Sequence, residues 1–582
     1  MLGCTRWLRV NGGNVNYKVV KLALRQLSSE PSLTYGYRKS QIQSGNDINE
    51  SKGSTPHSNE LPSSFYYPSI SSVRGQFKDA ITLRIPSFRE KFNDTDFSAF
   101  DNNRTRETYI IEGRIRSIRK SGKGMFFIDV IQDDVRLQVM AYNKLVGVNL
   151  AEFDKIHSWF KPGDYVSCHG FASRTKTGEL TLKLGDSMQI LTPCLNNIPS
   201  KLVDKGIINN HRVMNYLVNP ISKQPIIVKS KIIQFIRNFF VERGFLEVQT
   251  PILSSLGTGA NAQPFLTKFK NEDILLRVAP ELWLKKLVIG GFDKIFEIGC
   301  NFRNEGIDQT HNPEFTSCEF YQTYTSLNEL MEITETLFIE LFKTFNIPLC
   351  KETETEFGDE SGIHTFPRYE FLPTLEKITG KKLQDLSLET LINYYQSLGL
   401  EIPQNSDSNS YSSSNSNSNS NSSSNLNLNP ANLLNNLSEI YLESLSVTKH
   451  PNVPVIIFNQ PEILSPLAKS RKDSNCNGTN TIPVSLRFEL FINGKEYVNA
   501  YEEENDPSQQ LIKFKQQQLN KEKYGDNEML IPDWEYVKSM EIGLPPTGGW
   551  GIGIDRLAMF ISGADRIDQV LPFGNLRDVL KQ

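Results

Sequence analysis

The sequence predicts an α+β protein in which a small all-β barrel precedes a larger domain of hairpins and amphipathic helices. Short alternating segments separated by turn signals recur from Thr108 to about Thr192, which is typical of a barrel. From Ile226 to the C-terminus, apolar residues at helical spacing alternate with hairpin-like strands. At 582 residues the chain is also too long for one ordinary domain, and we expect two or three.

Composition and charge exclude several classes of protein. The seven cysteines lie at least eighteen positions apart, so neither a disulfide framework nor a CxxC-type metal or redox site is indicated. No stretch is apolar for long enough to predict a membrane span. The net charge is −3, and because residues 1–40 contribute +6, the rest of the chain carries −9. Any contact with RNA must therefore come from local basic patches.

The N-terminal segment has the composition of a targeting sequence. Its first acidic residue is Glu30, and apolar residues are interspersed with basic ones. This pattern is typical of a mitochondrial transit peptide, which we expect over residues 1–40; a disordered basic tail is the alternative. Residues 41–104 are predicted to be a linker and N-terminal extension, because their first part is rich in Ser, Asn, Gly and Pro.

In the predicted barrel, residues 105–198, strand parity separates a core from a surface. Alternation points Phe126, Ile128 and Val130 inward. The side chains expected to face outward include an aromatic ring, an amide and two guanidinium groups, at Phe127, Gln138, Arg114 and Arg116. Such a face suits stacking on single-stranded bases and reading their edges, although exposed aromatic residues are common on small barrels of any function.

The larger domain, residues 215–582, is expected to begin with a helix and an edge strand. Helical spacing of apolar residues indicates a helix within 226–241, with Gly244 placed to end it. The segment FLEVQTP then reads as a strand that stops at Pro251. A core helix leading into an edge strand explains this stretch without any chemistry.

Two further helices and one insertion are predicted in the same domain. The helices span residues 281–289, where two glycines follow, and 327–345, where the apolar spacing is again helical. Residues 404–429 are almost entirely Ser and Asn. Such a segment lacks apolar surface to bury, so we expect a disordered surface insertion.

The stretch from Lys294 to Tyr324 organises the predicted site, because it reads as two strands joined by a polar loop. Period-two alternation gives the first strand one polar face, formed by Glu297, Gly299, Asn301 and Arg303. The second strand has a matching face, formed by Phe315, Ser317, Glu319 and Tyr321. If these two faces lie opposite each other, they bring together a guanidinium group, an aromatic ring, a carboxylate and a phenol. Such a surface suits a charged ligand. The loop between them carries Glu305 and His311, which could close over that ligand.

A second hairpin is predicted around Asn493-Gly494, the strongest short turn signal in the chain. Its first arm carries Glu489, and Glu496 begins the return. On the returning strand one parity is shared by Asn499, Tyr501 and Glu503. The last element passes from a glycine-rich strand into a helix, and Arg556 projects from its first turns.

The chain resembles class II aminoacyl-tRNA synthetases in motifs 1, 2 and 3, which occur in the right order as FLEVQTPIL, NFRNEGIDQTHNPEFTSCEFY and GLPPTGGWGIGIDRLAMF. It is similar to lysyl-tRNA synthetases in RVAPELWLKKLVIGGFDKIFEIG, HNPEF, SPLAK, FELFING and GIGIDR. The resemblance runs from about residue 105 to the C-terminus, apart from the insertion. It implies a catalytic antiparallel sheet flanked by helices, an OB-fold anticodon domain before it, and a homodimer interface at motif 1. Trp550 departs from the small or aliphatic residue usual at its position.

This resemblance implies a reaction in two steps. The carboxylate of L-lysine attacks the α-phosphate of ATP, and the lysyl group then passes to the terminal ribose of tRNA(Lys). Arg303 and Arg556 are the implied catalytic residues. The implied ATP-binding set is Arg303, Glu305, His311, Phe315, Glu489 and Arg556. Glu489 and Glu496 are implied to hold Mg²⁺, an ion that prefers hard oxygen ligands.

The resemblance also implies contacts to the amino acid and the tRNA. The lysine-binding set is Glu281, Arg303, Glu319, Tyr321, Asn499, Tyr501 and Glu503, with Glu281 at the α-amine and Glu503 with Tyr321 at the ε-amine. The barrel residues Phe127 and Gln138 match positions that stack on and read the central anticodon base, and Glu179 is a third candidate contact. The mitochondrial matrix is expected from the N-terminal composition, and no membrane partner is expected because no long apolar stretch occurs.

Two alternatives compete with this reading. An aspartyl- or asparaginyl-type synthetase shares the barrel and the motifs but needs a cationic pocket, whereas this chain supplies Glu281 and Glu503. A synthetase relative that has lost activity and survives as an RNA-binding module has no physical need for both a phosphate clamp and metal carboxylates. Pyrophosphate exchange with each amino acid in turn separates the three hypotheses.

Overall fold

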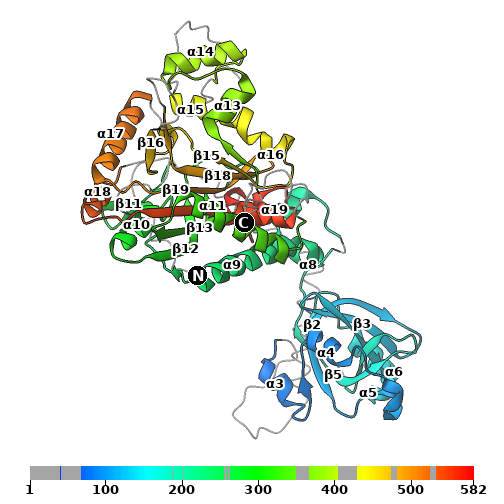
Figure 1. The fold of residues 1–582 in the computed structure, drawn as a ribbon. Coiled ribbons are helices and arrows are strands. Elements are labelled where there is room, and N and C mark those ends of the chain that lie inside the picture. Colours follow the sequence, from blue (N-terminus) through cyan, green and yellow to red (C-terminus); the bar gives the residue numbers. More distant parts are fainter. Residues whose placement is uncertain are drawn as a thin grey trace, which may run out of the picture. The chain divides into compact units, whose positions relative to one another are not determined.

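The computed structural model divides the chain into two compact units, residues 1–202 and 203–582 (Figure 1). It describes residues 38, 40, 67–147, 149–186, 188–199, 201–254, 259, 262–348, 366–403, 429–472, 482–524 and 532–581. Most of the predicted transit peptide and of the Ser/Asn insertion therefore lies outside the described residues. Among those residues, no helix is long and apolar enough to cross a membrane.

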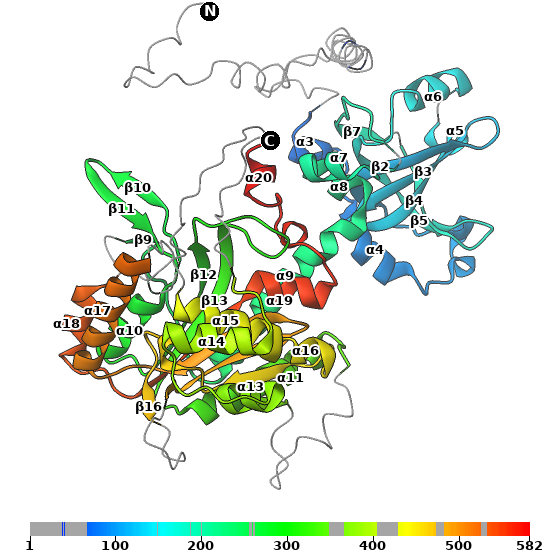
Figure 2. The same cartoon turned by 90° about the horizontal axis from the view of Figure 1, so that it is seen from above.

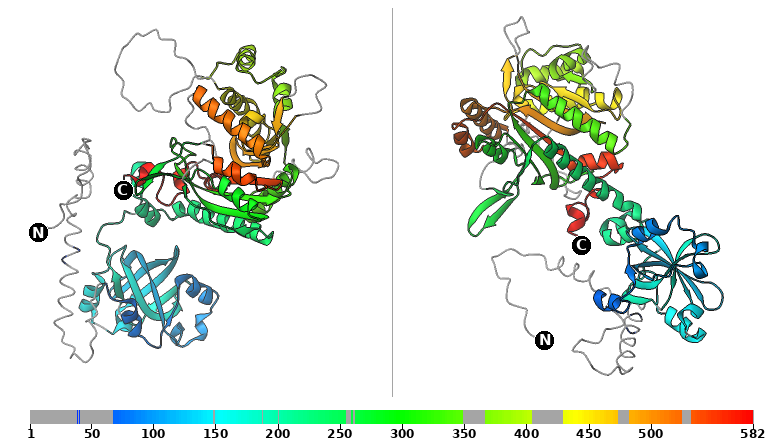
Figure 3. Two further views of the ribbon diagram at one scale, coloured as in Figure 1. Left: turned by 90° about the vertical axis from the view of Figure 1, so that its left-hand side faces the viewer. Right: turned by 60° about the horizontal axis from the view of Figure 1, so that its bottom comes forward.

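The first unit contains the predicted barrel. Its five main strands match the predicted segments and are β2 (Tyr109–Lys120), β3 (Met125–Gln132), β4 (Val135–Tyr142), β5 (Tyr165–Arg174) and β6 (Leu180–Leu184). They pair in the order β2-β3-β4-β6-β5, and β2 also pairs with β5, which closes the barrel (Figure 3). Between β4 and β5 lie two short helices, α5 (Asn143–Val146) and α6 (Leu150–His157). This closed arrangement confirms the OB-fold class.

Several elements of this unit were not predicted. Residues 67–104, expected to be a linker and extension, form α3 (Ile70–Gly75), β1 (Ile81–Thr82), α4 (Ile85–Phe92), η1 (Phe97–Ala99) and η2 (Asp101–Asn103), and β7 (Gln189–Thr192) pairs with β5. Helix α4 buries Ile85, Phe88 and Phe92 in the core of the barrel unit. The segment is thus part of the folded unit, because its apolar residues recur over two short turns that a composition argument does not detect.

Arg38 also belongs to the first unit. Its side chain is almost fully buried and forms an ion pair with Asp164, with 2.6 Å between Nη2 and Oδ2. Nη1 donates to the backbone oxygen of Trp159 at 2.6 Å. Residue 38 falls within the segment expected to be a transit peptide, and the boundary of that segment at residue 40 stays a prediction.

The second unit is built on an eight-stranded sheet in the order β14-β15-β18-β19-β20-β13-β12-β8. Its six central strands are antiparallel, while the two edge strands, β14 and β8, pair in parallel with their neighbours. The strands span β8 (Leu246–Glu247), β12 (Lys294–Phe302), β13 (Glu314–Thr323), β14 (Arg368–Glu370), β15 (Val455–Phe458), β18 (Arg487–Ile492), β19 (Lys495–Glu502) and β20 (Thr547–Gly553). This confirms the antiparallel sheet that the family resemblance implies.

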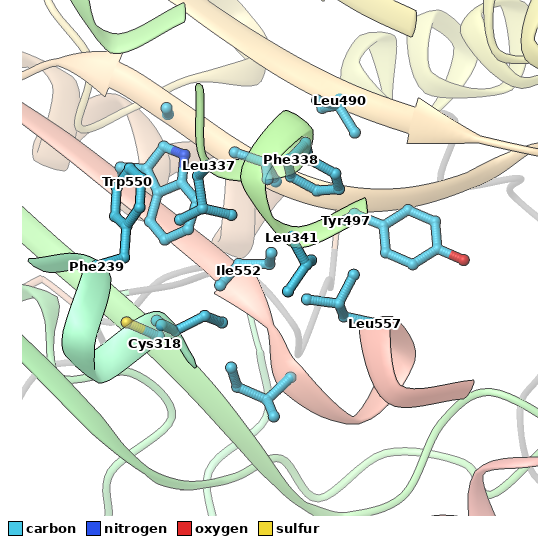
Figure 4. Packing of buried hydrophobic residues seen from close by; sticks show 14 of the residues in the cluster. Phe239, Cys318, Leu337, Phe338, Leu341, Leu490, Tyr497, Trp550, Ile552 and Leu557 are labelled. Atoms are coloured by element: carbon cyan, nitrogen blue, oxygen red, sulfur yellow. The ribbon is translucent and has the colours of Figure 1, made fainter. Parts of the chain in front are cut away.

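Three helices cover one face of this sheet: α9 (Gln224–Glu242), α11 (Leu327–Thr344) and α19 (Ile554–Ser562). Figure 4 shows Leu337, Phe338 and Leu341 of α11 gathered with Trp550 and Ile552 of β20. The unusual Trp550 is accommodated in this core because its indole Nε1 donates a hydrogen bond to Thr334 Oγ1 at 2.9 Å, which satisfies the buried N–H. The predicted site residues lie on the opposite face of the sheet.

The remaining elements form two groups beside the sheet (Figures 1 and 2). One group holds α13 (Phe371–Thr379), α14 (Leu388–Leu398), α15 (Pro430–Ser438), the π-helix η4 (Glu439–Glu443) and α16 (Leu445–Thr448). Apolar residues of the first four form a second core with Ile457 and Phe491 of the sheet. The other holds α10 (Glu281–Ile289), α17 (Pro507–Tyr524) and α18 (Trp534–Met540). A small sheet of β9 (Leu253–Ser254), β10 (Leu266–Phe269) and β11 (Glu272–Leu276) extends from the unit in Figure 2.

The predicted helices of this unit are confirmed. The stretches 226–241, 281–289 and 327–345 correspond to α9, α10 and α11. The strand FLEVQTP is shorter than expected, since only Leu246 and Glu247 pair with β12. The minor elements are α7 (Lys205–Asn210), α8 (Arg212–Val218), η3 (Pro220–Lys223), η5 (Glu462–Leu464), η6 (Ile567–Gln569), α20 (Leu576–Val579) and the hairpin β16 (Ser470–Lys472) with β17 (Pro483–Ser485).

Candidate active site

A cavity of about 460 Å³ opens on the sheet face opposite the three covering helices. Its walls come from both predicted hairpins, from α10, and from the end of β20 with the start of α19. Twelve of the predicted residues line it, namely Glu281, Arg303, Glu305, His311, Phe315, Glu319, Tyr321, Glu489, Glu496, Asn499, Tyr501 and Arg556. The two hairpins thus meet in one site although they are far apart in the sequence.

The first hairpin has the register that its alternation predicts. Glu319 faces Glu297 across the ladder, and Phe315 faces Asn301. Alternate residues Cys318 and Phe320 enter the core below the sheet, which leaves Glu319 and Tyr321 on the cavity side. The period of two in the sequence therefore becomes one charged face and one apolar face.

Arg303 lies directly after strand β12 rather than within it. Its backbone N–H donates to the oxygen of Pro313 at 2.8 Å, which closes the base of the loop between the strands. Its guanidinium carbon lies 5.1 Å from the centre of the Phe315 ring. The buried Nε has no hydrogen-bond partner among the described residues, so this N–H is a donor without an acceptor, and the side chain lines the cavity.

The second hairpin turns at Asn493 and Gly494, which both have positive φ, at 51° and 71°. A β-bulge then interrupts the ladder, because Leu490 pairs with Val498 whereas the next residue pairs with Glu496. The extra residue in the bulge returns Glu496 to the face that carries Glu489. Simple alternation would have placed Glu496 on the core side with Val498.

Arg556 and His311 meet at the far end of the cavity. The Nη2 atom of Arg556 lies 3.0 Å from Nε2 of His311, and Nη1 donates to the backbone oxygen of Glu496 at 2.5 Å. On its other side, Nδ1 of His311 lies 2.8 Å from a carboxylate oxygen of Asp308. Burial raises the pKa of Asp308, but hydrogen bonds from Thr310 and His311 outweigh it and lower this pKa to about 2. The carboxylate therefore holds the imidazole in place beside the guanidinium.

The opposite end of the cavity gathers carboxylates and phenols. Tyr501 Oη donates to Glu281 Oε1 at 2.7 Å, and Tyr321 Oη lies 3.4 Å from Glu319 Oε2. Burial and the neighbouring Glu281 raise the pKa of Glu319 to about 8. The same two causes raise the pKa of Tyr321 and Tyr501 well above the usual value for tyrosine. Without a bound cation this end of the cavity therefore tends to take up protons.

Glu503 is the one predicted residue of the catalytic unit that does not line the cavity. Its side chain is fully buried behind Gly549 and forms an ion pair with Lys285. Lys285 also contacts Glu281, with 2.6 Å between Nζ and Oε1. A Cβ atom at position 549 would clash with the Glu503 carboxylate and would lie 2.7 Å from the Tyr321 ring. Glycine at this position therefore keeps the cavity close to Glu503.

Glu489 and Glu496 offer oxygen ligands near the Arg556 end. Burial and the nearby Glu496 raise the pKa of Glu489, while its ion pair with Arg487 opposes that rise. Among the described residues, no group of three or more acidic, histidine or cysteine side chains is arranged to hold a metal ion. Two carboxylates nevertheless fit Mg²⁺, because this ion commonly keeps several waters and takes further oxygens from substrate phosphates.

The three anticodon candidates lie on one face of the barrel. Phe127 is half-buried on β3, and Gln138 is nearly buried on β4, where its Nε2 donates to Thr181 Oγ1 at 2.9 Å. Glu179 accepts a hydrogen bond from Arg136 Nη2 at 2.7 Å. The outward direction of this face is as predicted, since Leu137 and Val139 are buried in the core. Gln138, however, is less exposed than its parity suggested.

Sequence reasoning missed two charged residues of the site. Arg487 pairs with Glu489 and donates to Asn499 Oδ1 at 2.9 Å, so it links the two strands of the second hairpin. Its parity with Glu489 was a usable signal. Lys285 follows Glu281 by four residues, the spacing that puts two side chains on one helix face. That spacing could have identified it, but ELWLKKLVI was interpreted only as a short helix followed by two glycines.

Comparison with known proteins identifies the family. The profile of tRNA synthetases class II (D, K and N) matches residues 204–577, and that of the OB-fold nucleic acid binding domain matches residues 109–190. The chain therefore belongs to the class II tRNA synthetases of the D, K and N group, in agreement with its closed barrel, its antiparallel sheet and its site.

Within this family the chain is similar to lysine-tRNA ligases. It is 38% identical to the mitochondrial lysine-tRNA ligase of Saccharomyces cerevisiae over 542 residues, which cover 89% of this chain and 90% of the yeast protein. The mitochondrial lysine-tRNA ligase of Schizosaccharomyces pombe is also 38% identical, over 88% of this chain and 91% of its own length. The lysine-tRNA ligase of Thermotoga maritima is 34% identical over 86% of this chain and 91% of its own length.

Proposed function

We infer that this chain is a lysine-tRNA ligase that activates L-lysine with ATP and transfers it to tRNA(Lys). The observation that supports lysine as the substrate is the set of carboxylates at the amino-acid end of the cavity. Glu281 and Glu319 line the wall there, and Glu503 lies behind Gly549. Buried carboxylates need cations. Lysine brings two ammonium groups, whereas aspartate and asparagine bring one, and their side chains would need donors instead.

The proposed activation step forms a bond between the lysine carboxylate and the α-phosphorus of ATP, and pyrophosphate leaves. No enzyme nucleophile takes part, so catalysis depends on alignment and on neutralising charge on phosphate oxygens. Arg303 would bridge the α-phosphate and the substrate carboxylate with its planar fork. Its unpartnered Nε and its position over Phe315 support this role.

The nucleotide would lie between the two hairpins. Phe315 and Arg556 would stack on opposite faces of the adenine, with Glu305 at the base. Arg556 would also lie near the γ-phosphate, and His311 would contact the terminal phosphates. The contact of Arg556 with His311 supports a shared phosphate site at this end. Glu489 and Glu496 would hold Mg²⁺, which would shield the phosphate charges. In the second step, the terminal ribose hydroxyl of tRNA attacks the lysyl carbonyl and AMP leaves.

Pyrophosphate exchange into ATP, measured with each amino acid in turn, tests the assignment. We expect exchange with L-lysine and background rates with aspartate and asparagine. Exchange that depended on aspartate or asparagine would refute the lysine assignment. Absence of exchange with every amino acid would favour a non-catalytic RNA-binding relative.

We also propose a mitochondrial location and a homodimer. The yeast relatives are named mitochondrial, and the N-terminal composition supports import into the matrix. Apolar side chains that are more than two-fifths exposed occur together in the motif 1 region, at Val241, Leu246, Ile252 and Leu253. Such a cluster on a soluble unit suits burial against a second copy. Fluorescence localisation of the full chain against one lacking the leader tests the compartment.

A further inference from the structure

Lys285 is a charged residue of the site that the reaction proposed above does not use. Its side chain is fully buried and does not line the cavity, so it leaves the substrate space open. Its Nζ contacts Glu281 from the same helix and pairs with Glu503, which follows β19. The titratable groups that face it are these two carboxylates and the phenols of Tyr501 and Tyr536, whose rings lie 5.7 and 5.8 Å from Nζ.

We propose that Lys285 is a positioning residue that sets the charge of the amino-acid pocket by cancelling one of its three carboxylates. When lysine is bound and all three carboxylates are ionised, Lys285 leaves Glu281, Glu319 and Glu503 with a net charge of −2, which matches the two ammonium groups of one lysine. Arg303 remains for the substrate carboxylate. Without Lys285, one carboxylate would stay unbalanced when the substrate is bound.

Two further observations agree with a fixed charge at this position. Burial alone would lower the pKa of Lys285, but the adjacent Glu281 and Glu503 outweigh it and raise this pKa above its ordinary value, so the ammonium stays charged. The neighbouring Lys286 is different: it is partly exposed and pairs at 3.0 Å with Asp533, the N-cap of α18. Helix α10 therefore carries one lysine that contacts the pocket carboxylates and a second that contacts another helix.

Because this inference rests on the proposed function, wild-type exchange with L-lysine is measured first; its absence would reject the function itself. The decisive readout is the number of protons released when lysine binds, obtained by calorimetry in buffers of different ionisation enthalpy. In Lys285→Met the unbalanced carboxylate should bind a proton in the empty pocket. Because two ammonium groups balance only two carboxylates, the complex should keep this proton near neutral pH. Lysine binding should then release more protons than in the wild type only at higher pH, where the complex ionises before the more negative empty pocket does.

The matching controls separate charge from structure. Lys285→Arg keeps the charge and should restore the wild-type proton count, and Lys286→Met should leave it unchanged. If Lys285→Met does not fold, Lys285→Gln supplies a neutral side chain that can still donate to both carboxylates. A proton count that is unchanged at the higher pH as well in a folded neutral variant, together with an unchanged KM for lysine, would overturn the proposal.

A second inference follows independently from Arg38. Asp164 is fully buried and accepts hydrogen bonds from the backbone N–H groups of Lys161 at 2.8 Å and Cys194 at 2.7 Å. The guanidinium of Arg38 is the cation that pairs with it. Removing one partner of a buried ion pair leaves an uncompensated charge, which is strongly destabilising. We infer that proteolytic removal of a leader, if the chain is imported as proposed, stops before Arg38.

Two full chains shortened at the N-terminus test this limit without depending on import. The chain that begins at Arg38 after its initiator Met should unfold at the same temperature as the full chain, whereas one that begins at Gln41 should unfold at a lower temperature. Arg38→Gln should reproduce the loss. Arg106→Gln, which breaks an exposed pair with Asp101, should not. Equal unfolding temperatures for both truncations, or a mature N-terminus mapped beyond Arg38 by mass spectrometry, would overturn the inference.

Discussion

The backbone and the side chain of Arg303 have different structural roles. The backbone N–H fixes the start of the loop through Pro313, while the side chain above Phe315 keeps Nε without a partner. Replacing the side chain should therefore spare the fold and remove the proposed clamp on the α-phosphate.

We predict that Arg303→Ala lowers lysine-dependent exchange by roughly a hundred- to a thousandfold, the usual cost of losing one charge-stabilising donor. Arg303→Lys should recover little, because a point charge cannot bridge two oxygens as a planar fork does. Arg106→Ala serves as the control. Near-normal exchange in a folded Arg303→Ala protein would show that the clamp is elsewhere.

Glu319 gives a prediction about pH. Because its pKa is raised to about 8 in the empty site, it is mainly protonated at neutral pH, and a bound ammonium favours the ionised form. We predict that the KM for lysine falls as pH rises from about 6.5 towards 8, by up to about tenfold per pH unit. Glu319→Gln should flatten this profile. An equally steep profile in the variant would assign the titration to another group.

The same group also affects the stability of the ligand-free protein. A folded-state pKa that lies above the unfolded value stabilises the protein at low pH, and this stabilisation is lost as pH rises from about 4.5 through about 8. Thermal unfolding without lysine should therefore show a decline across this window that Glu319→Gln lacks. Added lysine should reduce the decline, since it favours the ionised carboxylate.

At the scale of elements, alternation was the strongest guide from the sequence. It predicted both polar faces of the first hairpin, the turn at Asn493-Gly494 and the strands of the barrel, because side chains alternate across a regular strand. It could not predict the bulge that carries Glu496 to the cavity, since one extra residue breaks the period locally. It also could not predict that Glu503 pairs with Lys285, which depends on packing between separate elements.

The barrel strand β3 gives a prediction at this scale. Phe127→Ala should weaken charging of tRNA(Lys) while leaving pyrophosphate exchange unchanged, because loss of one base-stacking ring costs about 1–3 kcal/mol of RNA binding. The comparison uses charging and exchange assays on the same preparation. Leu145→Ala, on the exposed surface of α5, is the matched control. Equal losses in both assays would argue against an anticodon role.

At the scale of the whole molecule, the order of two units and the class of each were predictable because their patterns extend over many residues. The core role of α4 was not, since the two turns of Ile85–Phe92 are too short to stand out from a linker composition. The ion pair between Arg38 and Asp164 was also not predictable, because no local sequence pattern around either residue indicates its partner.

A homodimer is the prediction that belongs to this scale. The chain of 66.1 kDa should give about twice that mass by light scattering, and Leu246→Asp should shift it towards the monomer. Ile542→Asp changes an even more exposed apolar residue outside the motif 1 region and should leave the mass unchanged. A wild-type chain that is monomeric at micromolar concentration would contradict the proposal.

Gly549 affects the shape of the cavity at its amino-acid end. Gly549 lines the cavity, and a Cβ atom there would clash with the Glu503 carboxylate and lie 2.7 Å from the Tyr321 ring. Any side chain at this position would therefore displace Glu503 and Tyr321. The position of a buried carboxylate at the amino-acid end of the cavity thus depends on an uncharged residue that has no side chain.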